Sequence, residues 1–302
     1  MMFHQALVLS IVLFAATGKA QVDFSYEGEY GPDHWAELYP MCGGSRQSPV
    51  NIQEDRTKKT SSPALWLYYP GSIPWEANLT NNGHTALLKL DPALPITLHG
   101  GPLSAPYVFQ QLHFHWGSND SVGSEHAINS HFSTMEMHMV FYKEEYGNPS
   151  NAAKYSDGFA VLSVLLDHNE NGNPVLPPVV WALQRIQNYG DVTNLDTRLA
   201  LESLLPNDRH LYYTYPGSLT TPPCDEAVTW IIFRQHVPIS SEQVAAFRTL
   251  KTEDGSLLIS NRRPLQPLGN RTVSLVSFSS SSSSRRRGAA AKRRGQHGRR
   301  RQ

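Results

Sequence analysis

The 302-residue sequence predicts a mainly β protein whose core is a large sheet of short, mostly antiparallel strands. Hydrophobic residues make up 40% of the chain, which is enough for a sizeable core. The chain also contains 21 Gly and 21 Pro, which indicate many turns. Short apolar runs alternate with Gly, Pro, Asn and Asp from Asp23 to Phe278, without an internal repeat, so we expect one domain there.

Six apolar runs are predicted to be strands, and two segments are predicted to be helices. The strands are expected at residues 64–69, 85–90, 107–116, 134–142, 158–166 and 227–233. Residues 177–190 begin with two prolines, end with Gly, and carry apolar residues at roughly helical spacing. Residues 240–250 begin with Ser240, three positions before Gln243, which is a capping-box pattern.

Residues 1–20 are predicted to be a cleaved secretory signal. The apolar run from Ala6 to Ala16 is too short to span a bilayer comfortably, and small residues precede Gln21. The segment before this run lacks Lys and Arg, and a buried N-terminal helix is the alternative. We therefore expect a secreted, extracellular protein with a mature domain over residues 21–278.

If the protein is secreted, its cysteines can form a disulfide and its N-x-S/T sequons can be glycosylated. An even pair of cysteines, Cys42 and Cys224, most simply forms one disulfide in an oxidising compartment. Asn78, Asn119 and Asn270 each begin an N-x-S/T sequon and are candidate glycosylation sites.

Residues 279–302 are predicted to be a disordered basic tail. Six serines are followed by nine basic residues and no acidic one, and such a segment cannot bury enough apolar surface to fold alone. The nine are Arg285, Arg286, Arg287, Lys292, Arg293, Arg294, Arg299, Arg300 and Arg301. Without these and Lys19, 16 basic residues remain against 26 acidic ones. The tail is either simply solvated or contacts polyanions such as sulfated glycans, acidic matrix or anionic lipids. We predict no transmembrane or GPI segment and no specific nucleic-acid partner.

Two predicted strands carry the residues that indicate chemistry. Alternate side chains of a strand share a face. One face of strand 107–116 is expected to hold Phe109, Gln111, His113 and His115, and the other Gln110, Leu112, Phe114 and Trp116. In strand 134–142, Glu136, His138 and Val140 share a face. Pairing these faces brings three imidazoles together, a ligand set known for catalytic zinc, with Gln111 and Glu136 as acceptors for their other N–H groups.

Each of these patterns also has an alternative interpretation. The histidines could be hydrogen-bonded core residues, or ligands of a cupin-type metal site. A cupin usually has Glu four or five residues after the second His, where this chain has Asn119 and Asp120. The hydroxyls of "SLTTPPC" (218–224) could belong to an active site or to an ordinary proline turn. His84 in "NNGH" (81–84) could be a turn residue facing solvent or a proton relay.

Eight motifs occur in the order found in α-class carbonic anhydrases. They are "GPDHW" (31–35), "RQSPVNI" (46–52), "NNGH" (81–84), "QLHFHWGS" (111–118), "GSEH" (123–126), "EMHMV" (136–140), "YPGSLTTPPC" (215–224) and "NRRPLQPL" (261–268). Over about residues 24–278, the chain therefore resembles this family. The resemblance implies a large twisted, mostly antiparallel sheet with a few short peripheral helices, and a Cys42–Cys224 disulfide as in secreted members.

The resemblance also implies roles for individual residues. It makes His113, His115 and His138 the Zn²⁺ ligands, supported by Gln111, Glu136 and the backbone of Asn261. It makes Thr220 accept a hydrogen bond from zinc-bound hydroxide and donate one to Glu125, with Thr221 beside it, and makes His84 the proton shuttle. Tyr26 and Asn82 match positions that order water. The apolar wall for carbon dioxide corresponds to Val140, Val161, Leu219, Val228 and Trp230.

The implied activity is the reversible hydration of carbon dioxide to bicarbonate and a proton by a secreted zinc lyase. Leu87 departs from the family, because many members carry Asn or Gln there, and the basic tail matches no common family feature. The alternative function is a non-catalytic extracellular protein that binds matrix or polyanions on the same scaffold. Silent relatives have typically lost zinc-ligand histidines, whereas this chain keeps all three, so we predict an enzyme.

Overall fold

We analysed a computed structural model of the chain, which describes residues 24–70, 76–90 and 94–278. The predicted signal (1–20) and the predicted basic tail (279–302) lie outside the described residues. Among the described residues, no helix is both long and apolar enough to cross a membrane.

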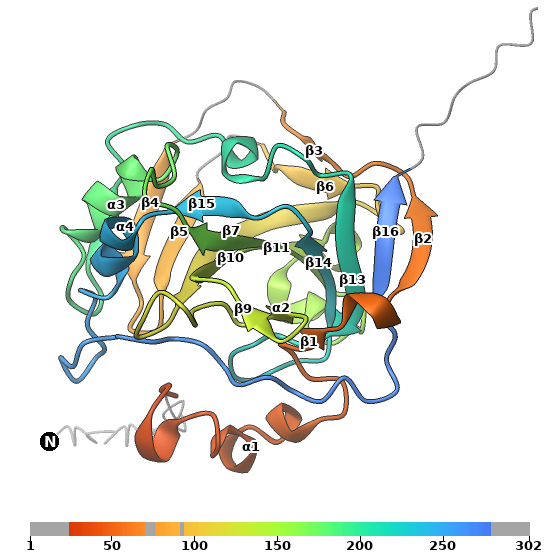
Figure 1. The fold of residues 1–302 in the computed structure, drawn as a ribbon, viewed down its shortest axis with the longest axis horizontal. Helices are drawn as coiled ribbons and strands as arrows, with labels where there is room; N and C mark the ends of the chain where they lie inside the picture. The colour runs from red at the N-terminus through yellow and green to blue at the C-terminus, as the bar shows by residue number, and fades with distance from the viewer. Residues whose placement is uncertain (1–23, 71–75, 91–93, 279–302) are drawn as a thin grey trace, which may run out of the picture.

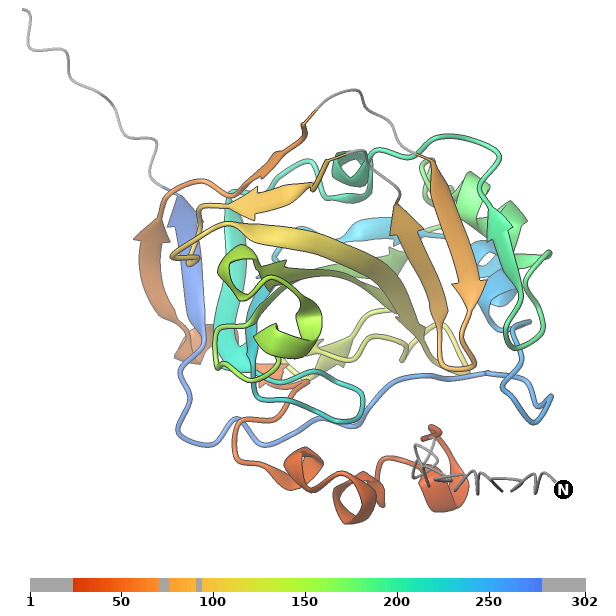
Figure 2. The same cartoon turned by 180° about the vertical axis from the view of Figure 1, so that it is seen from behind.

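A 13-stranded sheet forms the body of the molecule (Figures 1 and 2). Its main path runs through β12 (Val192–Asn194), β4 (Ala77–Asn81), β5 (Ala86–Leu90), β7 (Tyr107–Trp116), β10 (Met135–Lys143), β11 (Phe159–His168), β14 (Val228–Phe233), β13 (Leu211–Gly217), β16 (Ser274–Phe278) and β2 (Lys58–Ser62). Off this path, β15 (Val237–Ile239) pairs with β11, and β3 (Trp66–Tyr68) pairs with β6 (Thr97–His99), which also pairs with β7. A separate small sheet contains β1 (Asn51–Ile52), β8 (Ala127–Ile128) and β9 (His131–Phe132).

Most neighbouring strands of the large sheet are antiparallel, as predicted. The exceptions are β11, which pairs in parallel with β14 and β15, and β16, which pairs in parallel with β2. All six predicted strands are present, with ends that differ by up to two residues from the predicted bounds. The mainly β fold class is therefore confirmed.

Short helices lie at the periphery of the sheet (Figures 1 and 2). They are α1 (Trp35–Leu38), α2 (Pro149–Ala152), α3 (Pro177–Leu183), α4 (Ser241–Phe247) and the 3₁₀ turns η1 (Gly28–Tyr30), η2 (Pro40–Gly43), η3 (Glu54–Arg56), η4 (Glu144–Tyr146) and η5 (Leu201–Leu204). The capping box of Ser240 and Gln243 is formed at the start of α4. The predicted helix over 177–190 is wrong beyond Leu183, because the chain tightens there into turns in which Arg185 N–H donates to the Ala182 carbonyl and Ile186 N–H to that of Leu183.

The two faces of β10 belong to different environments. Met135, Met137 and Met139 are buried in the larger hydrophobic cluster, whereas Val140 belongs to a second cluster on the opposite face. This alternation leaves Glu136 and His138 on the same side as Val140, as expected for a strand.

The predicted faces of β7 are wrong for Phe109 and Gln110, because the strand contains a bulge there. The register between β7 and β10 shifts after Val140, which pairs with Gln111, so that Phe141 pairs with Phe109 and Gln110 is left as the extra residue. Phe109 therefore packs against the larger cluster, 5.5 Å from the Phe141 ring, and not on the histidine face. The bulge also brings Gln110 into the same cavity as Gln111.

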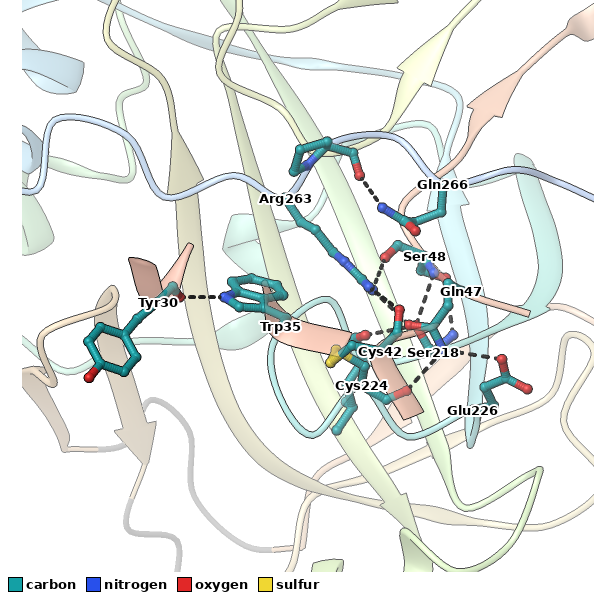
Figure 3. The surroundings of a disulfide bond; sticks show 12 residues. Tyr30, Trp35, Cys42, Gln47, Ser48, Ser218, Cys224, Glu226, Arg263 and Gln266 are labelled. Atoms are coloured by element: carbon teal, nitrogen blue, oxygen red, sulfur yellow. Dashed lines mark hydrogen bonds between the residues drawn. A yellow bond between two sulfur atoms is a disulfide. The ribbon is translucent and has the colours of Figure 1, made fainter. Parts of the chain in front are cut away.

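A disulfide joins the N-terminal segment to the loop after β13, as predicted (Figure 3). Cys42 and Cys224 are separated by 182 residues, so the chain-entropy model gives an upper stabilisation of roughly 5 kcal/mol. Arg263, which is buried, donates to the carbonyl oxygens of Cys42 (2.9 Å) and Ser48 (2.8 Å) beside the disulfide (Figure 3). The disulfide ties the loop that carries Thr220 to this segment.

The candidate glycosylation sites differ in exposure. Asn119 and Asn270 are exposed, whereas Asn78 is half-buried within β4. Asn119 and Asn270 are therefore the more accessible acceptors.

Candidate metal centre

Three histidines from β7 and β10 meet on one face of the sheet. His138 lies directly opposite His113 in the strand register, and Glu136 lies opposite His115. The possible ligand atoms of the three imidazoles all lie within 4.8 Å of one another. The prediction from strand alternation therefore holds for this group.

Each imidazole has one nitrogen held by an oxygen of the protein. Nδ1 of His113 lies 2.8 Å from Oε1 of Gln111, and Nε2 of His138 lies 2.7 Å from Oε1 of Glu136. Nδ1 of His115 lies 2.8 Å from the backbone oxygen of Asn261. These contacts assign the proton on each ring to the held nitrogen and leave the second nitrogen with a lone pair.

The second nitrogen of His115 supports a metal site. His115 Nε2 is buried and has no hydrogen-bond partner. It lies 3.4 Å from Oε2 of Glu125, which is also buried. A buried nitrogen without a partner is costly, and a cation bound between the three imidazoles would satisfy it. The residues present therefore fit a metal ion.

Burial keeps the imidazoles in the form that binds metal. It lowers the pKa of all three, that of His115 to about 4, and the neighbouring imidazoles lower the pKa of His113 further. Neutral imidazole is the form that coordinates a metal. The three side chains are thus uncharged across the physiological pH range.

Glu136 organises a buried network that the sequence analysis only partly anticipated. Its carboxylate accepts hydrogen bonds from the backbone N–H groups of Glu125 (2.9 Å) and His126 (2.8 Å) and from the Ser163 hydroxyl (2.7 Å). Burial alone would raise the pKa of Glu136, but His126 and His138 outweigh it and hold the pKa well below its usual range. Glu136 therefore remains an acceptor for His138.

His126 is a member of this network to which the sequence analysis gave no role. Its Nδ1 lies 2.7 Å from Oε1 of Glu136, and its Nε2 lies 2.7 Å from the hydroxyl of Tyr215. The Tyr215 hydroxyl in turn donates to Oγ of Ser48. The only feature of the sequence that could have indicated this role of His126 was its position directly after Glu125 in "GSEH".

Glu125 and Thr220 lie at the inner end of the site. Oε1 of Glu125 accepts a hydrogen bond from the backbone N–H of Arg263 at 2.9 Å. Burial raises the pKa of Glu125 to about 7, while His138, Arg263 and the Thr220 side chain act to lower it. Thr220 is 5% exposed and lines the cavity above the histidines. The influence of the Thr220 side chain on the pKa of Glu125 indicates that the two residues are neighbours in the site.

A cavity of about 310 Å³ opens above the histidines. Its described lining is Gln110, Gln111, His113, His138, Val140, Pro149, Ser150, Phe159, Val161, Leu219, Thr220, Thr221 and Trp230. Four of the five predicted wall residues are in this lining. The fifth, Val228, is fully buried in the hydrophobic cluster that contains Val140 and Val161, so it supports the wall from behind.

His84, Tyr26 and Asn82 are not among the described residues that line this cavity. Tyr26 is nevertheless close to the site, because burial and the charge of Glu125 together raise its pKa. The ring of His84 stacks on Phe24, with centroids 3.9 Å apart, and lines a separate groove together with Tyr26. Oδ1 of Asn82 accepts from the backbone N–H groups of His84 and Thr85 and so closes the turn between β4 and β5. The side chain of Asn261 donates to the His84 carbonyl (3.0 Å), which ties this turn to the histidine site.

The fold and the site define a class of protein: a twisted β-sheet enzyme with a three-histidine centre at the base of a partly apolar cavity. Residues 30–277 match the sequence profile of the family described as eukaryotic-type carbonic anhydrase. The chain belongs to this family, whose members are zinc enzymes that hydrate carbon dioxide, and it is a carbonic anhydrase by family.

Several curated proteins are similar to the chain over most of its length. Carbonic anhydrase 15 of Mus musculus is 41% identical over 83% of this chain and 81% of its own length. Carbonic anhydrase 6 of Mus musculus is 38% identical over 89% of this chain and 86% of its own length. Carbonic anhydrase 1 of Monodelphis domestica is 37% identical over 84% of this chain and 98% of its own length. The family resemblance stated from the motifs is therefore confirmed.

Proposed function

We propose that this chain is a secreted zinc enzyme that hydrates carbon dioxide reversibly at His113, His115 and His138. The observation that carries the proposal is the buried Nε2 of His115, which has no hydrogen-bond partner although its ring is fully enclosed. Zn²⁺ held by three neutral imidazoles supplies a nucleophile near neutral pH, because it lowers the pKa of water from 15.7 to about 7. Gln111, Glu136 and the carbonyl of Asn261 keep the ligand rings oriented for this role.

Thr220 and Glu125 would orient the attacking group. A hydroxyl has a single proton, so if Thr220 donates it to Glu125, its oxygen can only accept from the group that attacks carbon dioxide. That acceptance would aim the remaining lone pair of the attacking oxygen at the substrate. The backbone N–H of Arg263 holds the Glu125 carboxylate in place for this arrangement.

The apolar side of the cavity would hold carbon dioxide. Val140, Val161, Leu219 and Trp230 line it, and Val228 is packed behind them. These side chains offer no competing hydrogen bonds to a neutral, apolar substrate, whereas bicarbonate gains more from water outside. The wall would thus favour substrate entry and product release, with Thr221 available at its polar margin.

Zinc content is the direct test of the proposal. Purified protein is expected to contain about one zinc per chain and to hydrate carbon dioxide, because all three ligands are present and preorganised. Metal analysis and a stopped-flow hydration assay on the same sample provide the measurement. A sample that holds no stoichiometric zinc after expression in zinc-supplemented medium would contradict the proposal.

His84 is proposed as the proton shuttle, supported by Tyr26 and Asn82, which would order water toward it. We expect His84→Ala to slow hydration by about 10-fold or more at low buffer, because general acid–base transfer is worth at least that much. High imidazole buffer should restore the rate, since the buffer then accepts the proton directly. An unchanged rate of His84→Ala at low buffer would refute the shuttle.

Secretion is proposed from the predicted signal and from the disulfide. A disulfide of this kind is typical of an oxidising compartment. Glycosylation at Asn119 and Asn270 is proposed because both side chains are exposed, and at Asn78 from its sequon.

The basic tail is proposed to contact polyanions such as sulfated glycans or acidic matrix. We expect the full chain to be retained on a heparin column and to elute with salt, because the contacts are electrostatic. The matched control is the chain truncated after Phe278, where the family match has already ended. Equal retention of the truncated chain would eliminate this role of the tail.

A further inference from the structure

A second and larger hollow lies outside the metal centre. This groove has a volume of about 680 Å³ and shares no lining residue with the cavity above the histidines. Segments far apart in the sequence form its walls, namely residues 24–30, Gly83 and His84, Tyr189, and residues 252–260. We refer to it as the 252–260 groove.

Apolar side chains of the 252–260 groove are unusually exposed. Tyr30 and Tyr189 are each 47% exposed, Leu257 is 56% exposed and Ile259 is 41% exposed. A concentration of exposed apolar and aromatic residues in a groove is typical of a surface that binds a partner. The rings also offer flat faces on which a guanidinium can stack.

The groove is also acidic. Glu27, Glu253 and Asp254 line it, and no Lys or Arg occurs among its described lining residues. The Thr252 hydroxyl and the backbone N–H of Ser256 both donate to Asp254 and hold its pKa below the usual value, so it is ionised at neutral pH. A partner that fits this groove therefore carries positive charge on side chains that can also stack.

We propose that the 252–260 groove binds the chain's own Arg- and Lys-rich segment, residues 285–301. This segment holds nine basic residues and no acid, whereas the rest of the chain after residue 20 has 16 basic and 26 acidic residues. The charge complementarity between the segment and the groove singles out this occupant.

The segment is long enough to reach the groove. The end of β16 at Phe278 lies away from the segment that contains α1 (Figures 1 and 2), so the chain must pass around the body. An extended chain of 23 residues, from Phe278 to Arg301, spans up to about 80 Å. A domain of this size has a radius of gyration of about 18 Å. The tether also gives the segment a high effective concentration at the groove.

Binding of this kind is reversible and depends on salt. Single exposed ion pairs contribute little, so several Arg contacts and stacking on the Tyr rings must act together. A sulfated polyanion would compete with the groove for the same basic residues. The groove contact and the proposed polyanion contact are therefore alternative states of the tail.

Site-specific photo-crosslinking in the full mature chain tests the proposal. A photo-reactive amino acid in place of Leu257 is expected to crosslink to residues 285–301 of the same chain. High salt, a heparin oligosaccharide and the isosteric double substitution Glu253→Gln with Asp254→Asn should each reduce the crosslink yield several-fold. The control position is Trp181 in α3, which is 59% exposed and does not line the groove.

The outcomes separate clearly. A crosslink from position 257 but not from position 181, found in the monomer and weakened by the charge substitutions, supports the proposal. The proposal is overturned if no peptide from residues 285–301 is crosslinked to position 257, or if the crosslink forms only between two chains. It is also overturned if the charge substitutions leave the crosslink yield unchanged. The readout is independent of hydration activity, so it does not depend on the metal centre.

Discussion

His115→Ala is expected to lose its zinc and to hydrate carbon dioxide at least about 10³-fold more slowly than the wild type. The reason is that the substitution removes one of the three proposed ligands, and that the pKa of the water would no longer be lowered to about 7. Loss of a residue that only hydrogen-bonds to a metal ligand already lowers metal affinity by about 10- to 100-fold, so loss of a ligand itself should cost more. Metal analysis and stopped-flow hydration on the same preparation provide the measurement.

His131→Ala serves as the matched control for this substitution. His131 lies in β9 and is exposed, so removal of its imidazole should leave both zinc content and rate unchanged. Thermal unfolding of both variants shows whether they are folded. If folded His115→Ala keeps stoichiometric zinc and the full rate, His115 is not a ligand and the proposed centre is wrong.

Thr220→Val is expected to retain zinc but to lower kcat/KM by about 10²-fold. Valine has nearly the same shape as threonine but cannot donate to Glu125 or accept from the attacking group, and removal of one such oriented contact costs on the order of 10²–10³-fold. Thr220→Ser keeps the hydroxyl and should remain much closer to the wild type. Equal rates for the Val and Ser variants would show that the hydroxyl has no orienting role.

Thr220 lies on a different element from the three histidines, so we expect that it can be substituted without loss of zinc. Thr220 lies in the loop after β13, which the Cys42–Cys224 disulfide holds, whereas the histidines lie in β7 and β10. A substitution in this loop is therefore expected to change the orientation of the reacting groups and to leave the metal content unchanged. Zinc content and rate together distinguish the two substitutions.

Strand alternation was sufficient to predict that the three histidines lie together, and the family resemblance gave them their proposed role as ligands. The side-chain period of a strand is two residues, so His113 and His115 had to share a face wherever that strand lay. The same period placed His138 and Glu136 together on β10. The capping box of α4 was equally local, because Ser240 and Gln243 contact each other within one helical turn.

The sequence by itself therefore determined the mainly β class, the two strands that carry the three histidines, the disulfide pair and the family. Only the tertiary structure decided that Phe109 turns into the core at a bulge, that His126 supports Glu136, and that Val228 lies behind the cavity wall. It also decided that the side chain of Asn261 bonds to the β7 backbone, where the resemblance had implied a role for the Asn261 backbone alone. Local patterns repeat with the geometry of one strand or helix, whereas these contacts join residues more distant in the chain, and their partners depend on how the whole sheet packs.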